Sequence, residues 1–282
     1  MSWTTWSAPP AVVAPAAVSL ILFARGFLRL RRRGRLDHAD GRRAVLFALA
    51  LVLALLALAS PLDAAAESSL SAHMLQHVLI GEAAPALVLL ALRGPLLYFV
   101  VPAAAARPFA RSAALRRGLG LLFRPRVSLA VWALVFAAWH VPAVYDYALS
   151  HQAAHDLEHS MFFMAGILAW SQVVDPTRRK ALPAIRRLSC ALAMLVVGLG
   201  LAAVLLLTGP VYPAYERSGG PRLGLAQAGD QHDAAFVMVC AQLVALALCS
   251  AWLLRARTHP QGSTAHRHGG SLPADRAQPA VT

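Results

Sequence analysis

Long apolar runs alternate with short polar segments along the chain. Seven of these runs are close to the roughly 20 residues that an α-helix needs to cross the hydrocarbon core of a bilayer. The pattern predicts an all-α, polytopic membrane bundle of seven transmembrane helices, at residues 9–29, 43–60, 71–92, 127–144, 153–174, 187–208 and 232–254.

Two other segments fall outside this pattern. The run at residues 95–106 is too short to span a bilayer and is interrupted by Pro102, so we interpret it as interfacial or re-entrant. Residues 255–282 are rich in Gly, Pro and polar residues, a composition typical of disorder. We therefore expect residues 1–254 to form the transmembrane domain and residues 255–282 to form a disordered cytoplasmic tail.

The distribution of basic residues predicts the orientation of the helices. All but two of the 26 Lys and Arg residues lie in alternate loops or in the C-terminal tail, and the exceptions are Arg217 and Arg222. Basic residues are retained on the cytoplasmic side of a membrane protein. We therefore expect a multi-pass protein of the cell (plasma) membrane with its N-terminus outside and its C-terminus inside. The arginines would also attract anionic lipid.

Composition narrows the class of protein. Hydrophobic residues make up 58% of the chain and charged residues 14%, which is too apolar for an ordinary soluble domain. The net charge of +13 does not indicate a nucleic-acid-binding protein, because the basic residues lie between apolar runs and not on one soluble module. The three cysteines have no CxxC spacing, so neither a disulfide framework nor a zinc ribbon is indicated.

Histidines concentrate at the predicted outer ends of the helices. Seven of the 11 histidines are found there: His73, His77, His140, His151, His155, His159 and His232. In the helix predicted at 153–174, a spacing of about 100° per residue places one polar stripe on a single face. That stripe comprises His151, His155, Glu158, His159 and Phe162. Ionisable residues inside a membrane are costly and indicate a functional site.

This arrangement predicts a metal site facing the outer compartment. Imidazoles four residues apart on two helices can reach one ion, as they do in helical HxxxH sites. Nearby thioethers favour copper over magnesium or calcium. The candidate ligands are His73, His77, His140, His151, His155, His159, Met74 and Met238. Polar neighbours that would orient the imidazoles through hydrogen bonds are Gln76, Asp156, Glu158, Asp230, Gln231 and His232.

Glu82 lies in the same predicted helix as His73 and His77. At regular helical spacing it points to the face opposite His73. We expect it to pair with another helix or to take part in proton movement, and not to bind the metal.

Four segments resemble the bacterial CtaG-type cytochrome c oxidase assembly factors. They are SAHMLQH, WHVPAVYDYAL, HDLEHSMFFMAGILAW and DQHDAAFVM, within residues 40–254, and the chain departs from the family pattern at residues 171–172 and 234–235. The resemblance implies seven helices and a non-enzymatic role in forming active cytochrome c oxidase, with copper delivered to or inserted into an oxidase subunit. The motif positions that it implies are His73, Gln76, His77, His140, His155, Glu158, His159, Asp230 and Gln231.

Two other functions fit the same residues. His77 and His159 on facing helices would ligate a b-type haem in a membrane redox protein. Alternatively, the His and Glu residues would form the relay of a metal- or proton-coupled transporter. The sequence contains no GxSxG, HExxH or P-loop motif, so we do not expect an enzyme.

Overall fold

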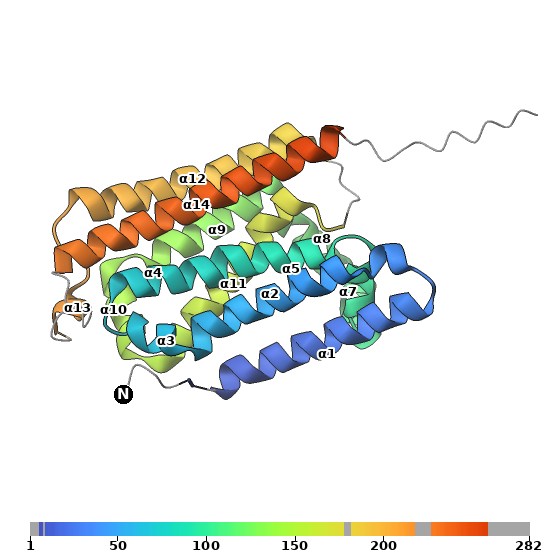
Figure 1. Cartoon of the computed structure of the whole chain (residues 1–282), viewed down its shortest axis with the longest axis horizontal. Helices are drawn as coiled ribbons and strands as arrows, with labels where there is room; N and C mark the ends of the chain where they lie inside the picture. The colour runs from blue at the N-terminus through green and yellow to red at the C-terminus, as the bar shows by residue number, and fades with distance from the viewer. Residues whose placement is uncertain (1–5, 8, 178–181, 218–226, 259–282) are drawn as a thin grey trace, which may run out of the picture.

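The structure is a computed structural model that describes residues 6–7, 9–177, 182–217 and 227–258. Every regular element in these residues is helical, as the sequence predicts, and the long helices run side by side (Figure 1). In chain order the elements are α1 (Pro10–Arg32), η1 (Leu36–His38), α2 (Gly41–Ala59), α3 (Pro61–Ala66), α4 (Leu70–Val78), η2 (Leu79–Ala83), α5 (Ala84–Leu92), α6 (Pro95–Val100), α7 (Ala103–Arg111), α8 (Ala113–Leu122), α9 (Pro125–Trp139), α10 (Pro142–Ser150), α11 (Gln152–Val174), α12 (Ala184–Leu207), α13 (Pro213–Arg217) and α14 (Gln227–Thr258).

Fewer helices than predicted have the length and apolar character of a membrane span. Five helices in the described residues have this character. Helices α8 and α9 have it only when they are taken together, with a bend of 74° between them, and counting this pair as one span gives six. When α8 and α9 are counted as one span, the remaining difference from seven is α11, which is long enough but carries His155, Glu158 and His159 in its N-terminal half. The count of seven and the orientation in the membrane stay predictions. The five other spans are Pro10–Arg32, Leu36–Ala59, Leu70–Leu92, Ala184–Leu207 and Ala228–Leu254.

A single π-helical turn, η2, joins α4 to α5. It lies where Gly81 meets Gly166 of α11, and a Cβ atom at Gly166 would overlap the carbonyl oxygen of Gly81. Glycine is therefore needed for the two helices to approach this closely. The close approach brings together the N-terminal parts of both helical segments, which carry most of the histidines.

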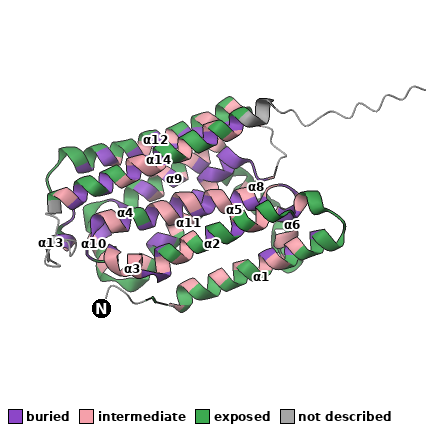
Figure 2. Ribbon diagram, viewed as in Figure 1, coloured by how far each residue is buried: buried purple, intermediate pink, exposed green. Residues whose placement is uncertain are grey.

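The core lies between α4, α9, α11, α12 and α14. Helix α14 packs against both α12 and α4, while α11 packs against α9 and α5 (Figure 1). Large buried side chains between these helices include Trp132, Phe136, Phe162 and Trp170. Helix α1 lies at the edge of the bundle and is largely exposed, with an apolar surface suited to lipid (Figure 2).

Two arginines at the predicted cytoplasmic end bind helix termini. The Arg187 guanidinium donates to the last two carbonyl groups of α11, at 2.6 and 3.2 Å, and lies 4.6 Å from the ring centroid of Trp252 on α14. Arg43 of α2 donates to the carbonyl groups of Ala91 and Arg93 at the end of α5. Both arginines therefore satisfy helix-terminal carbonyls, in addition to the orienting role that the sequence predicts.

Candidate metal centre

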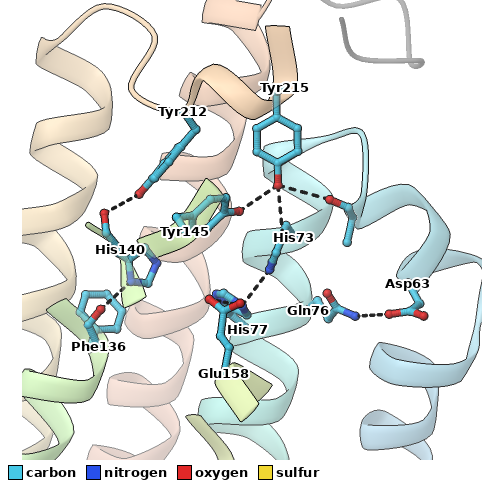
Figure 3. Close-up of polar contacts among 11 residues, drawn as sticks. Asp63, His73, Gln76, His77, Phe136, His140, Tyr145, Glu158, Tyr212 and Tyr215 are labelled. Atoms are coloured by element: carbon cyan, nitrogen blue, oxygen red, sulfur yellow. Dashed lines mark hydrogen bonds and ion pairs between the residues drawn. The ribbon is translucent and has the colours of Figure 1, made fainter. Parts of the chain in front are cut away.

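Four histidines and one glutamate meet between α4 and α11, at the end of the bundle away from these arginines (Figure 1). Figure 3 shows three of them, His73, His77 and Glu158. One ligand atom from each of His73, His155, Glu158 and His159 lies within 4.8 Å of the others. His77 joins them through Nε2, which is 2.9 Å from Nε2 of His73 and 3.5 Å from Oε1 of Glu158. We call these five residues the histidine cluster.

Four residues of the histidine cluster are withdrawn from solvent, and His155 is partly exposed. His73 and Glu158 are completely buried, and only 6–7% of His77 and His159 is exposed. Within the described part of the chain, several buried atoms have no hydrogen-bond partner: Nδ1 of His77, Nε2 of His155 and His159, and both carboxylate oxygens of Glu158. Buried polar atoms are normally paired because leaving them unpaired is costly. Imidazole nitrogens and carboxylate oxygens that converge in this way are the kind of donors that cation sites use.

Two tyrosines fix the orientation and tautomer of His73. The Tyr215 hydroxyl donates to the carbonyl oxygen of Ala66 at 3.2 Å, so it accepts the Nδ1 proton of His73 at 3.0 Å (Figure 3). The lone pair of His73 is then on Nε2, which faces His77. Tyr145 donates to Tyr215 at 2.9 Å. Burial raises the pKa of Tyr215, so its hydroxyl keeps its proton and acts as a neutral partner. Sequence analysis missed both tyrosines.

His140 follows α9 and lies beside the histidine cluster, with its ring centroid 5.8 Å from that of His77. Its Nδ1–H donates to the Phe136 carbonyl at 2.7 Å, so its lone pair is on Nε2. Among the described residues this Nε2 has no partner. The predicted ligands Met74 and Met238 line a cavity of about 20 Å³ together with His77 and His140. The structure thus places the methionines beside the histidine cluster and not within it.

His151 and Asp156, which the sequence predicts at a metal site, are exposed and lie outside the histidine cluster. His151 precedes α11 with an extended backbone (φ −134°, ψ 103°), and its exposed ring stacks on Tyr147 at 4.0 Å. The helical stripe therefore begins only after His151, and the prediction that His151 is a ligand does not fit the structure. Asp156 is also exposed, and it accepts a hydrogen bond from Gln152 at 2.9 Å. It does not orient an imidazole.

Asp230 is buried, but it binds a helix terminus and not an imidazole. Its carboxylate accepts hydrogen bonds from the backbone N–H groups of Leu70 and Ser71, at 2.6 and 3.1 Å. It also accepts from the hydroxyls of Ser69 and Ser71, at 2.9 and 2.5 Å. A carboxylate at a helix N-terminus pairs orphan N–H groups and favours the helix dipole. Asp230 therefore holds α14 against the first turn of α4, just before His73.

The other predicted orienting residues also contact groups outside the histidine cluster. Gln76 donates to a carbonyl oxygen of α2 and to the Asp63 carboxylate, both at 2.8 Å. Gln231 binds backbone groups at the end of α12 and in the loop after it. His232 is exposed. Gln76 and Gln231 thus link helices, whereas Glu158, predicted only to orient imidazoles, belongs to the histidine cluster itself.

Glu82 pairs with another helix, as predicted, through a hydrogen bond that Gln242 of α14 donates at 3.2 Å. It does not turn away from the site, because it lines the same small cavity as His77. The π-helical turn interrupts the regular spacing on which the sequence prediction relied.

Comparison with known proteins gives one match. The family described as cytochrome c oxidase caa3 assembly factor matches residues 21–258. The chain belongs to this family. No curated protein and no solved structure matches it. The resemblance to this family is thereby confirmed, and every residue of the histidine cluster lies in the matched region. Membership also agrees with a membrane setting and with oxidase-related partners.

Proposed function

We propose that this caa3 assembly factor binds copper in the histidine cluster and passes it to a subunit of cytochrome c oxidase. The main support is the convergence of four imidazoles and one carboxylate, in which Nε2 of His155 and His159 and both oxygens of Glu158 have no hydrogen-bond partner within the described residues. Imidazole suits copper, zinc, iron and nickel. Among these, copper is favoured because the resemblance to oxidase assembly factors implies copper delivery. Copper is then cargo and not a permanent cofactor.

The surroundings of the histidine cluster suit an ion that is first held and then released. Tyr215 keeps Nε2 of His73 available, and the Glu158 carboxylate offsets the charge of a bound cation. The histidine cluster lies at the end of the bundle that the arginine pattern predicts outside the cytoplasm. At that end an oxidase subunit reaches the site without the ion crossing the bilayer.

A b-type haem ligated by His77 and His159 receives less support. The centroids of these two rings are 5.6 Å apart, and the ring of His73 lies 4.4 and 6.1 Å from them. The cavity beside His77 has a volume of about 20 Å³, against the roughly 300–1,000 Å³ of pockets that hold organic ligands. A larger apolar groove of about 470 Å³ borders His159, but His77 is not among its lining residues.

Metal analysis of the purified protein tests copper binding. We expect the wild type to retain copper after gel filtration, and a His155→Ala, His159→Ala double variant to lose most of it. The matched control is His151→Ala, which removes an exposed imidazole next to the same helix and should leave the copper content unchanged. Equal copper in the double variant and the wild type would show that the histidine cluster is not the site.

Delivery is tested separately in cells that lack the protein. Oxidase purified from such cells should contain less copper, and the wild type and His151→Ala should restore it. The His155→Ala, His159→Ala variant should not. A full copper complement in oxidase from the deletion strain would rule out the delivery role, whatever the purified assembly factor binds.

A further inference from the structure

The cavity next to the histidine cluster has a chemical character of its own. It lies on the side of His77 that faces α9 and α14, and its functional side chains are Met74, His77, Glu82, His140, Met238 and Gln242. Four helical segments, α4, η2, α9 and α14, thus contribute a donor group to a volume of about 20 Å³. A volume of this order holds one water molecule or one bare ion.

Two of the side chains that line this cavity are methionines, whose thioethers are soft donors. Met74 and Met238 are 1% and 3% exposed and come from different helices, so two buried methionines line the same cavity. The imidazole of His140 adds a lone pair at Nε2, because its Nδ1 proton is held by the Phe136 carbonyl. Thioether and imidazole together suit a cuprous ion, whereas the carboxylate and imidazoles of the histidine cluster suit a divalent ion.

Packing alone does not explain the lining of this cavity. Methionine often fills irregular gaps in a core, and such gaps are lined by apolar groups. Here Nε2 of His140 and Oε1 of Gln242 are both buried, and neither has a hydrogen-bond partner in the part of the chain that the structure describes. Glu82 reaches the same space from the π-helical turn. The polar lining indicates an occupant that binds lone pairs.

We propose that this cavity is a second metal site, selective for a cuprous ion held by Met74, Met238 and His140. The proposal rests on the proposed function, since it assumes that the chain handles copper. It adds a site that differs from the histidine cluster in donors and in preferred oxidation state. His77 borders both sites. The proposal concerns binding only and includes no redox step.

Anaerobic titration with a cuprous salt against a competing chelator tests this second site, together with X-ray absorption at the copper edge. The test variant is Met74→Leu, Met238→Leu, which removes both sulfur atoms at nearly constant volume. The matched control is Met164→Leu, because Met164 is 60% exposed and lies outside this cavity. We expect the test variant to lose sulfur scattering and cuprous affinity by more than about tenfold, and the control to behave as wild type.

A third variant separates this proposal from the proposed function. His155→Ala, His159→Ala should lose the histidine-cluster ion while its cuprous ion keeps its sulfur neighbours. Wild-type protein that binds copper without sulfur scattering, or an unchanged Met74→Leu, Met238→Leu variant, overturns the second site and leaves the histidine cluster standing. Wild-type protein that binds no copper in either oxidation state overturns both. If the double methionine variant does not fold, X-ray absorption of the wild type and of the histidine variant still tests the second site, because sulfur scattering from bound copper in both proteins supports it and its absence overturns it.

Discussion

Asp63 makes the predicted outer end of the protein sensitive to pH. It lies in α3, before the first turn of α4, and accepts a hydrogen bond from Gln76 at 2.8 Å. Burial raises the pKa of Asp63 above its ordinary value, and the negative charges of Glu67 and Asp156 raise it further, while the bond from Gln76 opposes them. The folded protein therefore binds a proton at Asp63 more tightly than the unfolded chain does.

The sign of this effect gives a prediction for Asp63→Asn. The ionised carboxylate destabilises the fold, and this contribution is absent below the unfolded pKa of about 3.9, grows as the pH rises toward the pKa of the folded state, and is constant above it. Asparagine keeps an oxygen for Gln76 but carries no charge. Thermal unfolding in detergent should show similar stability for variant and wild type near pH 4, and an increasing advantage for the variant toward pH 7. A constant or reversed difference would contradict the assignment.

The control for this measurement is Asp233→Asn, because Asp233 is an exposed carboxylate on α14. It should follow the wild type across the same pH range. A parallel rise in both variants would show that the overall loss of negative charge, and not the burial of Asp63, causes the effect.

Individual residues also show where prediction of the site succeeds and fails. Helical spacing places His155, Glu158 and His159 on one face, and the structure brings their ligand atoms together. The same spacing fails for His151, because the helix begins one residue later. Tyr215 lies far from the histidines in sequence, and only the folded chain brings its hydroxyl to His73.

At the level of elements, the π-helical turn explains the position of Glu82. A regular helix advances about 100° per residue, and that rule turns Glu82 away from His73. The turn at Leu79–Ala83 has a different hydrogen-bond spacing and shifts the residues within and after it. Sequence periodicity contains no signal for such a turn, so the prediction was right about the pairing of Glu82 and wrong about its face.

The contact between η2 and α11 predicts a large effect for Gly166→Ala. The added methyl group would overlap the Gly81 carbonyl and come within 2.9 Å of Pro85. Overpacking of this kind costs about 1–3 kcal/mol. Thermal unfolding in detergent should therefore show a clear loss of stability, with weaker copper retention because the two histidine-bearing helices are forced apart.

Gly200→Ala is the matched control for this substitution. It lies within α12, and nothing is within 4 Å of an added Cβ atom. Alanine favours a helix interior by up to about 1 kcal/mol relative to glycine, so this variant should be at least as stable as the wild type. Equal losses of stability in the two variants would mean that the close contact between Gly81 and Gly166 does not cause the effect of Gly166→Ala.

At the level of the whole molecule, apolar runs predicted most of the helices. The runs at 71–92 and 187–208 correspond closely to Leu70–Leu92 and Ala184–Leu207. The run at 127–144 does not end as one helix, because the chain turns after Trp139 and Pro142 starts α10. Run length alone does not locate such breaks, since they depend on local backbone geometry and tertiary contacts.

The predicted orientation is tested by cysteine labelling. In a variant without the three native cysteines, Glu67→Cys places a thiol after α3 and Arg117→Cys places one in α8, at opposite ends of the bundle (Figure 1). Both positions are exposed. A membrane-impermeant maleimide should label the first variant in intact cells and the second only after permeabilisation. The reverse pattern would place the histidine cluster on the cytoplasmic side.

The guanidinium groups of Arg43 and Arg187 bind backbone carbonyl groups, which are dipoles and carry no net charge. Dissolved ions screen attraction between exposed opposite charges over about 8 Å at physiological ionic strength, but they weaken short, partly buried contacts much less. The end of the bundle that these arginines hold therefore stays assembled in concentrated salt. High ionic strength weakens the attraction between the exposed arginines of this surface and anionic lipid headgroups without loosening the helices beneath it.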